Sequence, residues 1–163
     1  VKPEEVFWAA SDMGWAVGHS YILYAPMINR NTSVIFEGKP IKTPDSSTFW
    51  RIISEHKVET MLTAPTAIRA IKKEDPEGEF IKNYDLSHLR NQFVAGERCD
   101  AATIEWYQKH IPISVIDHWW QTESGWPMVA NSLGLGEFSM KLGSATKPVC
   151  GYDLKIFSED GKE

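Results

Sequence analysis

The sequence has little cysteine, no long apolar run and no excess of positive charge. Its two cysteines, Cys99 and Cys150, lack the paired spacing of metal ligands, which argues against a disulfide framework or a structural zinc site. We expect both to be buried, small apolar side chains in a protein of a reducing compartment, either the cytoplasm or, in a eukaryote, the mitochondrial matrix. The longest apolar stretch, residues 21–28, contains Pro26 and is far shorter than the roughly 18 residues that a membrane span needs.

The charge balance excludes a second class of partner. The 163 residues include 17 Lys and Arg against 22 Asp and Glu, so the net charge is -5. That is the wrong sign for a surface that binds nucleic acid through its phosphates. We therefore expect small-molecule ligands, with neither a nucleic-acid nor a membrane partner.

What the sequence does contain is typical of a folded segment of a larger protein. Apolar residues make up 42% and charged residues 24%, a composition that supports a buried core. The first residues, Val1–Glu5, include no initiator Met and no signal-peptide pattern, so we expect the chain to begin inside a longer polypeptide.

Short β-rich stretches alternate with helical patterns along most of the chain. Pro65 suits the first turn of a helix, and Asp45 and Asp100 are candidate N-caps. The expected strands are residues 6–10, 32–36, 60–64, 89–95, 113–116 and 152–157, and the expected helices are residues 15–27, 45–56, 65–71 and 100–110. This order predicts an α/β fold with a mostly parallel sheet flanked by helices.

The strand ends are the places to look for a ligand site, because open parallel sheets bind ligands beyond the carboxyl ends of their strands. Chemically unusual residues are concentrated in the junctions at residues 10–15, 63–66, 94–98 and 117–125. We expect these junctions to converge on one cavity.

The last of these junctions combines large rings with acidic side chains. Trp119 and Trp120 lie beside Asp117, Thr122 and Glu123, which suggests a ligand with a flat or apolar part and a cationic or metal-bound part. A single carboxylate such as Glu123 binds Mg²⁺ only with help from substrate phosphates and water. The alternative, in which the rings fill the core and the acids are solvated, stays open on these residues alone.

Several sharper motifs are incomplete. The segment around Ser20, residues 18–22, lacks the second glycine of a nucleophile elbow, and residues 143–147 lack the glycine that a phosphate loop needs before its lysine. The histidines have no metal-ligand spacing, and we expect most of them at the surface or at helix ends.

Five ordered segments together resemble the acetyl- and propionyl-CoA synthetase branch of the adenylate-forming (AMP-binding) superfamily. They are WAASDMGW with GHSY (residues 8–15 and 18–21), FEGKP (36–40), TAPTAIRA (63–70), AGER (95–98) and DHWWQTESG (117–125). The resemblance implies a two-step ligase that forms an acyl-adenylate from a short carboxylate and ATP and then transfers the acyl group to CoA.

By the family's motifs, the resemblance also implies roles for individual residues. Thr122 and Glu123 match the catalytic pair, with Glu123 as the Mg²⁺ ligand and Thr122 as a phosphate-contacting hydroxyl. The nucleotide-binding set is Gly96, Glu97, Arg98, Asp117, His118, Trp119, Gln121 and Thr122, in which residues 96–98 support adenine and Asp117 accepts from its amino group. Residues 63–67 resemble the stretch near the pantetheine tunnel.

The acyl pocket implied by the same resemblance consists of Trp15, Ala16, Val17, Ala95 and Trp120. Trp120 matches the indole that closes it. Ala95 stands where acetate-specific relatives carry valine, which frees room for about one or two carbons, a difference of about 1 to 3 kcal/mol in a tight pocket. The resemblance therefore favours propionate over acetate.

The resemblance also implies that parts of the enzyme lie outside this sequence. The phosphate loop is expected upstream of Val1, and the small C-terminal domain with its lysine downstream of Glu163. Residues 1–163 are then an internal part of the large N-terminal domain, inactive by itself. Two alternatives are a non-catalytic nucleotide-binding or interaction module that keeps the fold, and a carbohydrate-binding module that uses exposed tryptophans.

Overall fold

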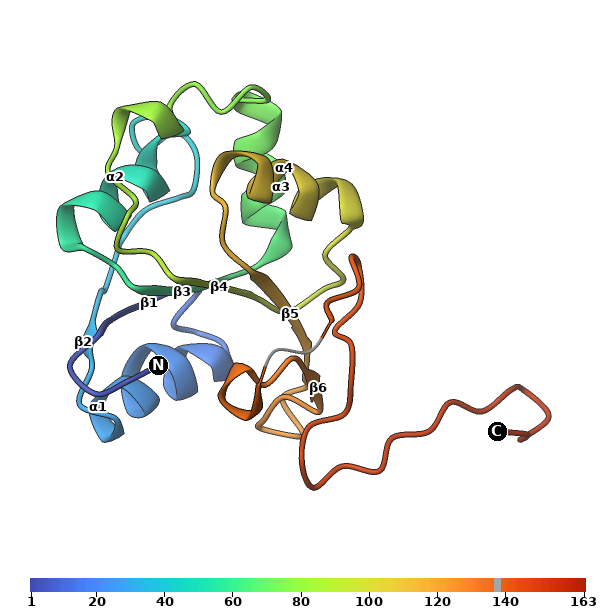
Figure 1. Cartoon of the computed structure of the whole chain (residues 1–163). Helices are drawn as coiled ribbons and strands as arrows, with labels where there is room; N and C mark the ends of the chain where they lie inside the picture. The colour runs from blue at the N-terminus through green and yellow to red at the C-terminus, as the bar shows by residue number, and fades with distance from the viewer. Residues whose placement is uncertain (137–138) are drawn as a thin grey trace.

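The computed structural model describes residues 1–136 and 139–163. Within this part of the chain, strands form one sheet in the order β2-β1-β3-β4-β5-β6 (Figure 1). The strands are β1 (Val6–Ala10), β2 (Thr32–Ser33), β3 (Thr60–Thr63), β4 (Asn91–Val94), β5 (Val115–Trp119) and β6 (Val129–Ala130). Neighbouring strands are parallel except for β6, which is antiparallel to β5. The predicted α/β fold with a mostly parallel sheet is confirmed.

Helices cover both faces of this sheet. The helices α2 (Thr48–His56), α3 (Pro65–Glu74) and α4 (Ala101–His110) lie on one face, and the π-helix η1 (Gly18–Tyr24) with α1 (Ala25–Ile28) lies on the other (Figure 1). Two short 3₁₀ helices, η2 (Ile81–Asn83) and η3 (Leu133–Leu135), complete the regular structure of the described residues. None of the helices in the described residues is both long and apolar enough to span a membrane.

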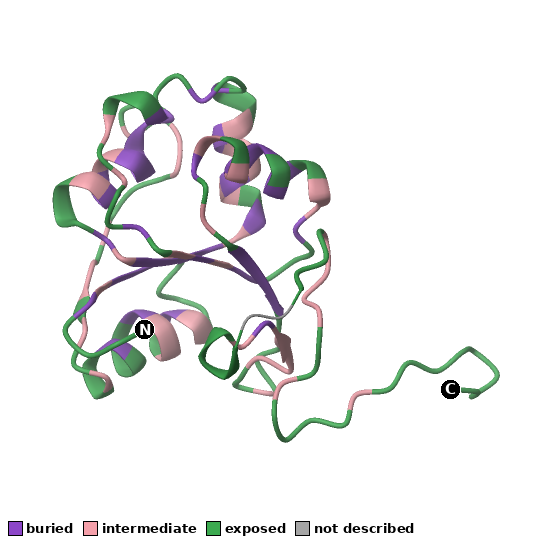
Figure 2. Cartoon of the chain, viewed as in Figure 1, coloured by how far each residue is buried: buried purple, intermediate pink, exposed green. Residues whose placement is uncertain are grey.

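Buried residues lie in the strands and in the helices on both faces of the sheet (Figure 2). Because side chains alternate along each strand, the core is divided between the two faces. In β1, Trp8 packs with the large cluster under α2, α3 and α4, whereas Phe7 and Ala9 belong to a smaller cluster on the η1 face. The smaller cluster also contains Ile22 and Leu62. This second, thinner core supports the floor of the site described below.

Two of the predicted helix starts are confirmed. Asp100 caps α4, since its Oδ1 accepts a hydrogen bond from the backbone N–H of Thr103 at 2.9 Å. Pro65 is the first residue of α3. Asp45, by contrast, is not a helix cap: α2 starts at Thr48, and the Asp45 carboxylate accepts from the N–H of Ser47 at 2.8 Å in a turn that precedes the helix.

Other boundaries differ from the prediction. The strand expected at residues 32–36 is only Thr32–Ser33, and β5 continues to Trp119, so part of the predicted ligand loop is strand. The helix expected from residue 15 begins one residue later, since Ala16 and Val17 are helical and lead into η1 at Gly18. No strand forms at residues 152–157, where Ile156 is 83% exposed and the segment runs away from the sheet (Figure 1). It lies apart from every strand edge in the described structure.

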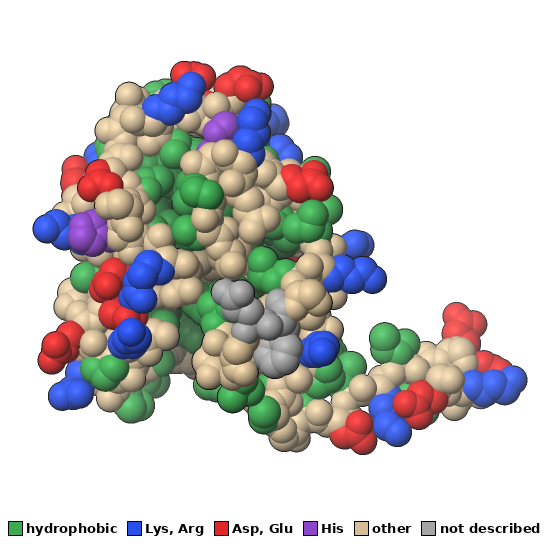
Figure 3. Space-filling view, viewed as in Figure 1, with side chains coloured by type: hydrophobic (Ala, Val, Ile, Leu, Met, Phe, Trp, Pro, Cys, Tyr) green, Lys and Arg blue, Asp and Glu red, His purple; other side chains and the backbone are tan. Residues whose placement is uncertain are grey.

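The two cysteines differ in burial, and the surface carries charges of both signs. Cys99 is buried as expected, but Cys150 is exposed, so the expectation was wrong for that residue. Acidic and basic side chains are interspersed over the face in view, and the C-terminal arm carries both signs (Figure 3).

Candidate functional site

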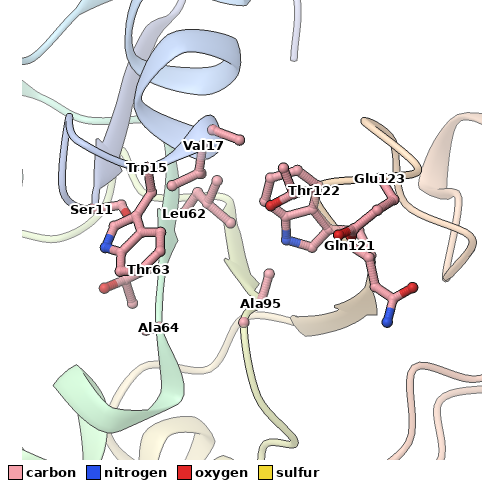
Figure 4. Close-up of a pocket in the computed structure, with 13 residues that line it drawn as sticks. Ser11, Trp15, Val17, Leu62, Thr63, Ala64, Ala95, Gln121, Thr122 and Glu123 are labelled. Atoms are coloured by element: carbon pink, nitrogen blue, oxygen red, sulfur yellow. The ribbon is translucent and has the colours of Figure 1, made fainter.

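A cavity of about 500 Å³ lies at the carboxyl ends of β1, β3, β4 and β5 (Figure 4). All the predicted junctions contribute to its wall. The lining residues are Ser11, Trp15, Ala16, Val17, Leu62, Thr63, Ala64, Ala95, Gly96, Trp120, Gln121, Thr122 and Glu123. The five residues predicted for an acyl pocket thus share one cavity with the predicted catalytic pair.

The turn after β1 fixes one side of the cavity. Asp12 accepts a hydrogen bond from the N–H of Gly14 at 2.7 Å, and the N–H of Gly18 donates to the carbonyl oxygen of Trp15 at 2.9 Å. A Cβ on Gly18 would lie 2.4 Å from the backbone of Met13, so only glycine permits this approach. This tight turn leads into the helix and brings Trp15 and Val17 to the cavity wall.

Ser124 organises the opposite side. Its hydroxyl lies 2.8 Å from the carbonyl oxygen of Gln121 and accepts from the N–H of Gln121 at 3.1 Å. The N–H of Gly125 also donates to the Gln121 carbonyl at 3.1 Å, with Gly125 at φ +61°. This closed turn presents Thr122 and Glu123 toward the cavity.

Thr122 and Glu123 are both exposed on the cavity wall. Within the described residues, neither side chain makes a hydrogen bond or an ion pair, so their oxygens face solvent and are available to a ligand. No group of three or more His, Cys, Asp and Glu in the described part of the chain could hold a metal ion. A cation at Glu123 would therefore need further ligands besides the acidic, histidine and cysteine side chains of the described residues.

The turn after β4 is held by Glu97. Its Oε1 accepts from the N–H of Thr66 in the first turn of α3 at 2.9 Å, and its Oε2 lies 2.6 Å from the Arg69 guanidinium. Gly96, at φ +98°, has nothing within 4 Å of where a Cβ would stand. The Glu97 carboxylate is therefore engaged by α3, while the backbone at Gly96 is open to the cavity.

Arg98 and Asp117 lie beside this turn but outside the cavity wall. Arg98 Nε donates to the carbonyl oxygen of Gly143 at 3.0 Å, and Asp117 Oδ2 accepts from the N–H of Cys99 at 3.3 Å. Burial raises the pKa of Asp117, with smaller opposing contributions from hydrogen bonds and Arg98. Burial and the neighbouring Asp117 raise the pKa of the Cys99 thiol to about 12, so this thiol stays protonated.

His118 and Trp119 also lie outside the cavity. His118 lines a different cavity and packs edge-on against Phe93, with ring centroids 5.9 Å apart. Burial lowers the pKa of His118 to about 4, and its Nδ1 has no hydrogen-bond partner in the described residues. The expectation of a surface or helix-end position was wrong for this histidine. Trp119, at the end of β5, is 46% exposed.

Sequence reasoning missed two contributors to the site. Leu62, the third residue of β3, lines the cavity, and Ser124 holds the turn that carries Thr122 and Glu123. The signal for Leu62 was its position immediately before the 63–66 junction, where an inward-facing side chain reaches the strand ends. Ser124 lay within the predicted loop but was not given a structural role.

The chain has a mostly parallel α/β fold with a cavity at the carboxyl ends of its strands, the place where open sheets of this kind bind ligands. A family model described as "AMP-binding enzyme" matches residues 1–163. The chain therefore belongs to the AMP-binding enzyme family.

The chain is similar in sequence to acyl-CoA synthetases and CoA ligases. The chain is 50% identical over 161 residues to the mitochondrial acyl-CoA synthetase short-chain family member 3 of Bos taurus, covering 98% of this chain and 24% of the relative. It is 43% identical over 158 residues to the propionate–CoA ligase of Escherichia coli K12, covering 97% of this chain and 25% of the relative. The chain thus spans about a quarter of the length of these curated relatives.

A solved structure shares the fold. The crystal structure of the anthranilate CoA ligase AuaEII in complex with anthranoyl-AMP matches with a TM-score of 0.81 and 26% identity, covering 99% of this chain and 29% of that one.

Proposed function

We propose that residues 1–163 form part of the large N-terminal AMP-binding domain of an ATP-dependent short-chain acyl-CoA synthetase. The observation that carries the proposal is the single cavity in which Trp120 and Ala95 lie beside Gly96, Thr122 and Glu123. The similarity to a short-chain acyl-CoA synthetase and to a propionate–CoA ligase supports the same activity.

The proposed reaction has two steps. A carboxylate oxygen of the acid attacks the α-phosphorus of ATP, the new O–P bond forms and the bond to pyrophosphate breaks, leaving acyl-AMP. The sulfur of CoA then attacks the acyl carbonyl, the C–S bond forms and AMP leaves. Negative charge gathers on the phosphate in the first step, and donors aimed at that charge lower its barrier.

The acyl part of the ligand would lie between the indole of Trp120 and the small side chains of Ala16, Val17 and Ala95. The surroundings are apolar, because Leu62 and Ala95 belong to the smaller core cluster and Val17 and Trp120 pack against it. The methyl group at position 95 leaves room for a three-carbon chain, so we propose propionate as the preferred acid.

The nucleotide part would lie over Gly96, where the open backbone accepts a flat ring. Thr122 would donate to a phosphate oxygen, and Gln121 lies beside it on the wall. Asp117, Arg98 and Trp119 flank this area, with Glu97 holding the turn in place. His118 points to the other cavity, and we propose no nucleotide contact for it.

Glu123 is the carboxylate on this wall that fits a magnesium ion carried by the nucleotide. It would provide one oxygen, with phosphates and water completing the coordination. When bound, Mg²⁺ neutralises charge on the phosphates. ATP, Mg²⁺ and CoA are thus the proposed cofactors and co-substrate, and we propose the cytoplasm or the mitochondrial matrix as the compartment that supplies them.

The test is pyrophosphate release by the full-length protein with ATP, Mg²⁺ and acetate, propionate or butyrate. We expect the highest kcat/KM with propionate. Glu123→Gln is expected to lower kcat/KM by about 100-fold, since a ligand to the charge-neutralising ion is lost, while Glu105→Gln, an exposed carboxylate on α4, leaves it unchanged. Nucleotide binding without pyrophosphate release would instead support the non-catalytic module, and sugar binding without an ATP response would support the carbohydrate-binding module.

A further inference from the structure

A second cavity, of about 770 Å³, lies on the η1 face of the sheet. Leu62 lines both cavities, so the two share a wall that is one side chain thick at this point. Tyr21 lines the second cavity, and Trp120 lines the first. Their rings meet edge to face, with centroids 6.0 Å apart and planes at 72°.

We propose that Tyr21 is a positioning residue that sets the length of the acyl pocket by holding the Trp120 indole in place. The inference rests on the proposed function, because it concerns which acids fit beside Trp120. It adds a residue from outside the substrate cavity to those that determine specificity.

The backbone under Tyr21 is held firmly, which is what a positioning role requires. At the start of η1, Gly18 packs directly on Met13. At the other side of Tyr21, the Ser33 hydroxyl donates to the carbonyl oxygen of Ile22 at 2.9 Å, which attaches η1 to the edge strand β2. The Tyr21 ring therefore cannot move away from Trp120 unless η1 moves, and η1 is fixed at Gly18 and at Ile22.

The Tyr21 ring holds Trp120 by packing alone, with an edge-to-face contact between the two rings. The Tyr21 hydroxyl makes no hydrogen bond within the described residues, and the ring packs against the small cluster that contains Leu62 and Ala95. Edge-to-face pairs of this kind contribute about 0.5 to 1.5 kcal/mol beyond the area they bury. Removing the ring would leave free space next to the indole, where its edge-to-face neighbour now stands.

The consequence for the pocket follows from the shared wall. With a shorter side chain at position 21, the indole of Trp120 can tilt toward the second cavity, and the first cavity lengthens. A longer acyl chain then fits without a change in any residue that touches it. The nucleotide side of the cavity, at Gly96 and Thr122, stays as it is.

The experiment measures KM and kcat for propionate, butyrate and pentanoate in pyrophosphate release by the full-length protein, with Tyr21→Leu and Tyr21→Phe. Tyr21→Leu is expected to lower the KM for pentanoate relative to propionate about tenfold or more, a change typical of one or two methylene groups, with the KM for ATP unchanged. Tyr21→Phe, which keeps the ring, should retain the wild-type ratio. Tyr24→Leu, on the same helix but 55% exposed, is the matched control.

An unchanged pentanoate-to-propionate ratio in an active Tyr21→Leu enzyme would overturn the inference, as would a change of ratio in Tyr21→Phe. If thermal melting shows that Tyr21→Leu is unfolded, Tyr21→Met, which also removes the ring but keeps a long apolar side chain, replaces it, and the same ratio decides the result. Absence of pyrophosphate release by the wild-type enzyme with every acid would contradict the proposed function itself, which separates the two failures.

Discussion

The Glu97 carboxylate accepts a hydrogen bond from the backbone N–H of Thr66 at 2.9 Å and so connects the turn after β4 to the first turn of α3. A negative charge at this end of a helix is favourable, because the N-terminal N–H groups carry partial positive charge. The same carboxylate pairs with Arg69, which also lies 3.4 Å from Asp100. One residue thus fixes the position of Gly96 relative to two helices.

Glu97→Ala is expected to lower the free energy of unfolding by about 1 kcal/mol, a value at the low end for a charged hydrogen bond because the side chain is 38% exposed. It should also raise the KM for ATP more than the KM for the acid, since the turn under the proposed adenine site loosens. Urea unfolding and steady-state kinetics measure the two effects. Glu77→Ala, which removes an exposed carboxylate 3.8 Å from Lys109, is the control and should change neither.

Ala95→Val is expected to convert the acid preference from propionate to acetate. The substitution adds two methyl groups to the cavity wall facing Trp120, and the preference should change by about 10- to 200-fold in kcat/KM. The ratio of kcat/KM for propionate and acetate is the measurement. Ala102→Val, at an exposed position of α4, is the control. A propionate preference that survives in Ala95→Val would contradict the role of position 95.

We expect the folded state to lose stability in acid because His118 is buried. Its pKa is about 4 in the folded chain because of burial, against about 6.5 when unfolded, so the unfolded state binds the extra proton between these values. Stability is full above pH 6.5 and falls as the pH decreases toward 4, by about 2 kcal/mol between pH 7 and pH 5 from this group.

Urea unfolding of residues 1–163 at pH 7 and pH 5, with His118→Gln, measures this contribution. The difference between the two pH values should be about 2 kcal/mol smaller in His118→Gln than in the wild type. The buried Asp117, whose raised pKa acts in the opposite direction, is present in both proteins and cancels. His56→Gln, at an exposed position, should behave as the wild type. Equal pH dependence in His118→Gln and wild type would contradict the assigned pKa.

Tyr107→Phe is expected to destabilise the domain without changing the cavity, because Tyr107 is not among the residues that line it. The Tyr107 hydroxyl donates to Gln92 Oε1 at 2.8 Å, and both residues are buried. The substitution leaves a buried acceptor without its donor, at a cost of about 1 to 3 kcal/mol. Thermal or urea unfolding measures the loss, and unchanged KM values for ATP and acid in the full-length protein show that the site is intact. Tyr152→Phe, outside the core, is the control and should unfold as the wild type does.

The sequence predicted best those features that local signals or simple topology determine. Pro65 and Asp100 mark the starts of α3 and α4, and both assignments hold because a fixed φ and a capping carboxylate act within one turn. The convergence of the junctions followed from the alternating order of strands and helices, since parallel strands present their carboxyl ends at one edge.

Features that depend on tertiary contacts could not be predicted. We predicted residues 117–125 as one loop, but residues 117–119 belong to β5. Side chains alternate along this strand, so Asp117 lies on the α4 face and His118 on the η1 face. Residues 152–157 have strand-like composition, but a strand forms only beside a partner, and none of the described strands pairs with them. The Tyr21–Trp120 contact joins segments about a hundred residues apart and leaves no local signal.

We propose above that one cavity holds both the acyl group and the nucleotide phosphate. The decisive measurement is a crystal structure of the full-length protein with the propyl ester of AMP, a stable analogue of propionyl-AMP. We expect the propyl chain to lie between Trp120 and Ala95, with the phosphate beside Thr122. A propyl chain bound outside this cavity, with AMP elsewhere on the protein, would contradict it.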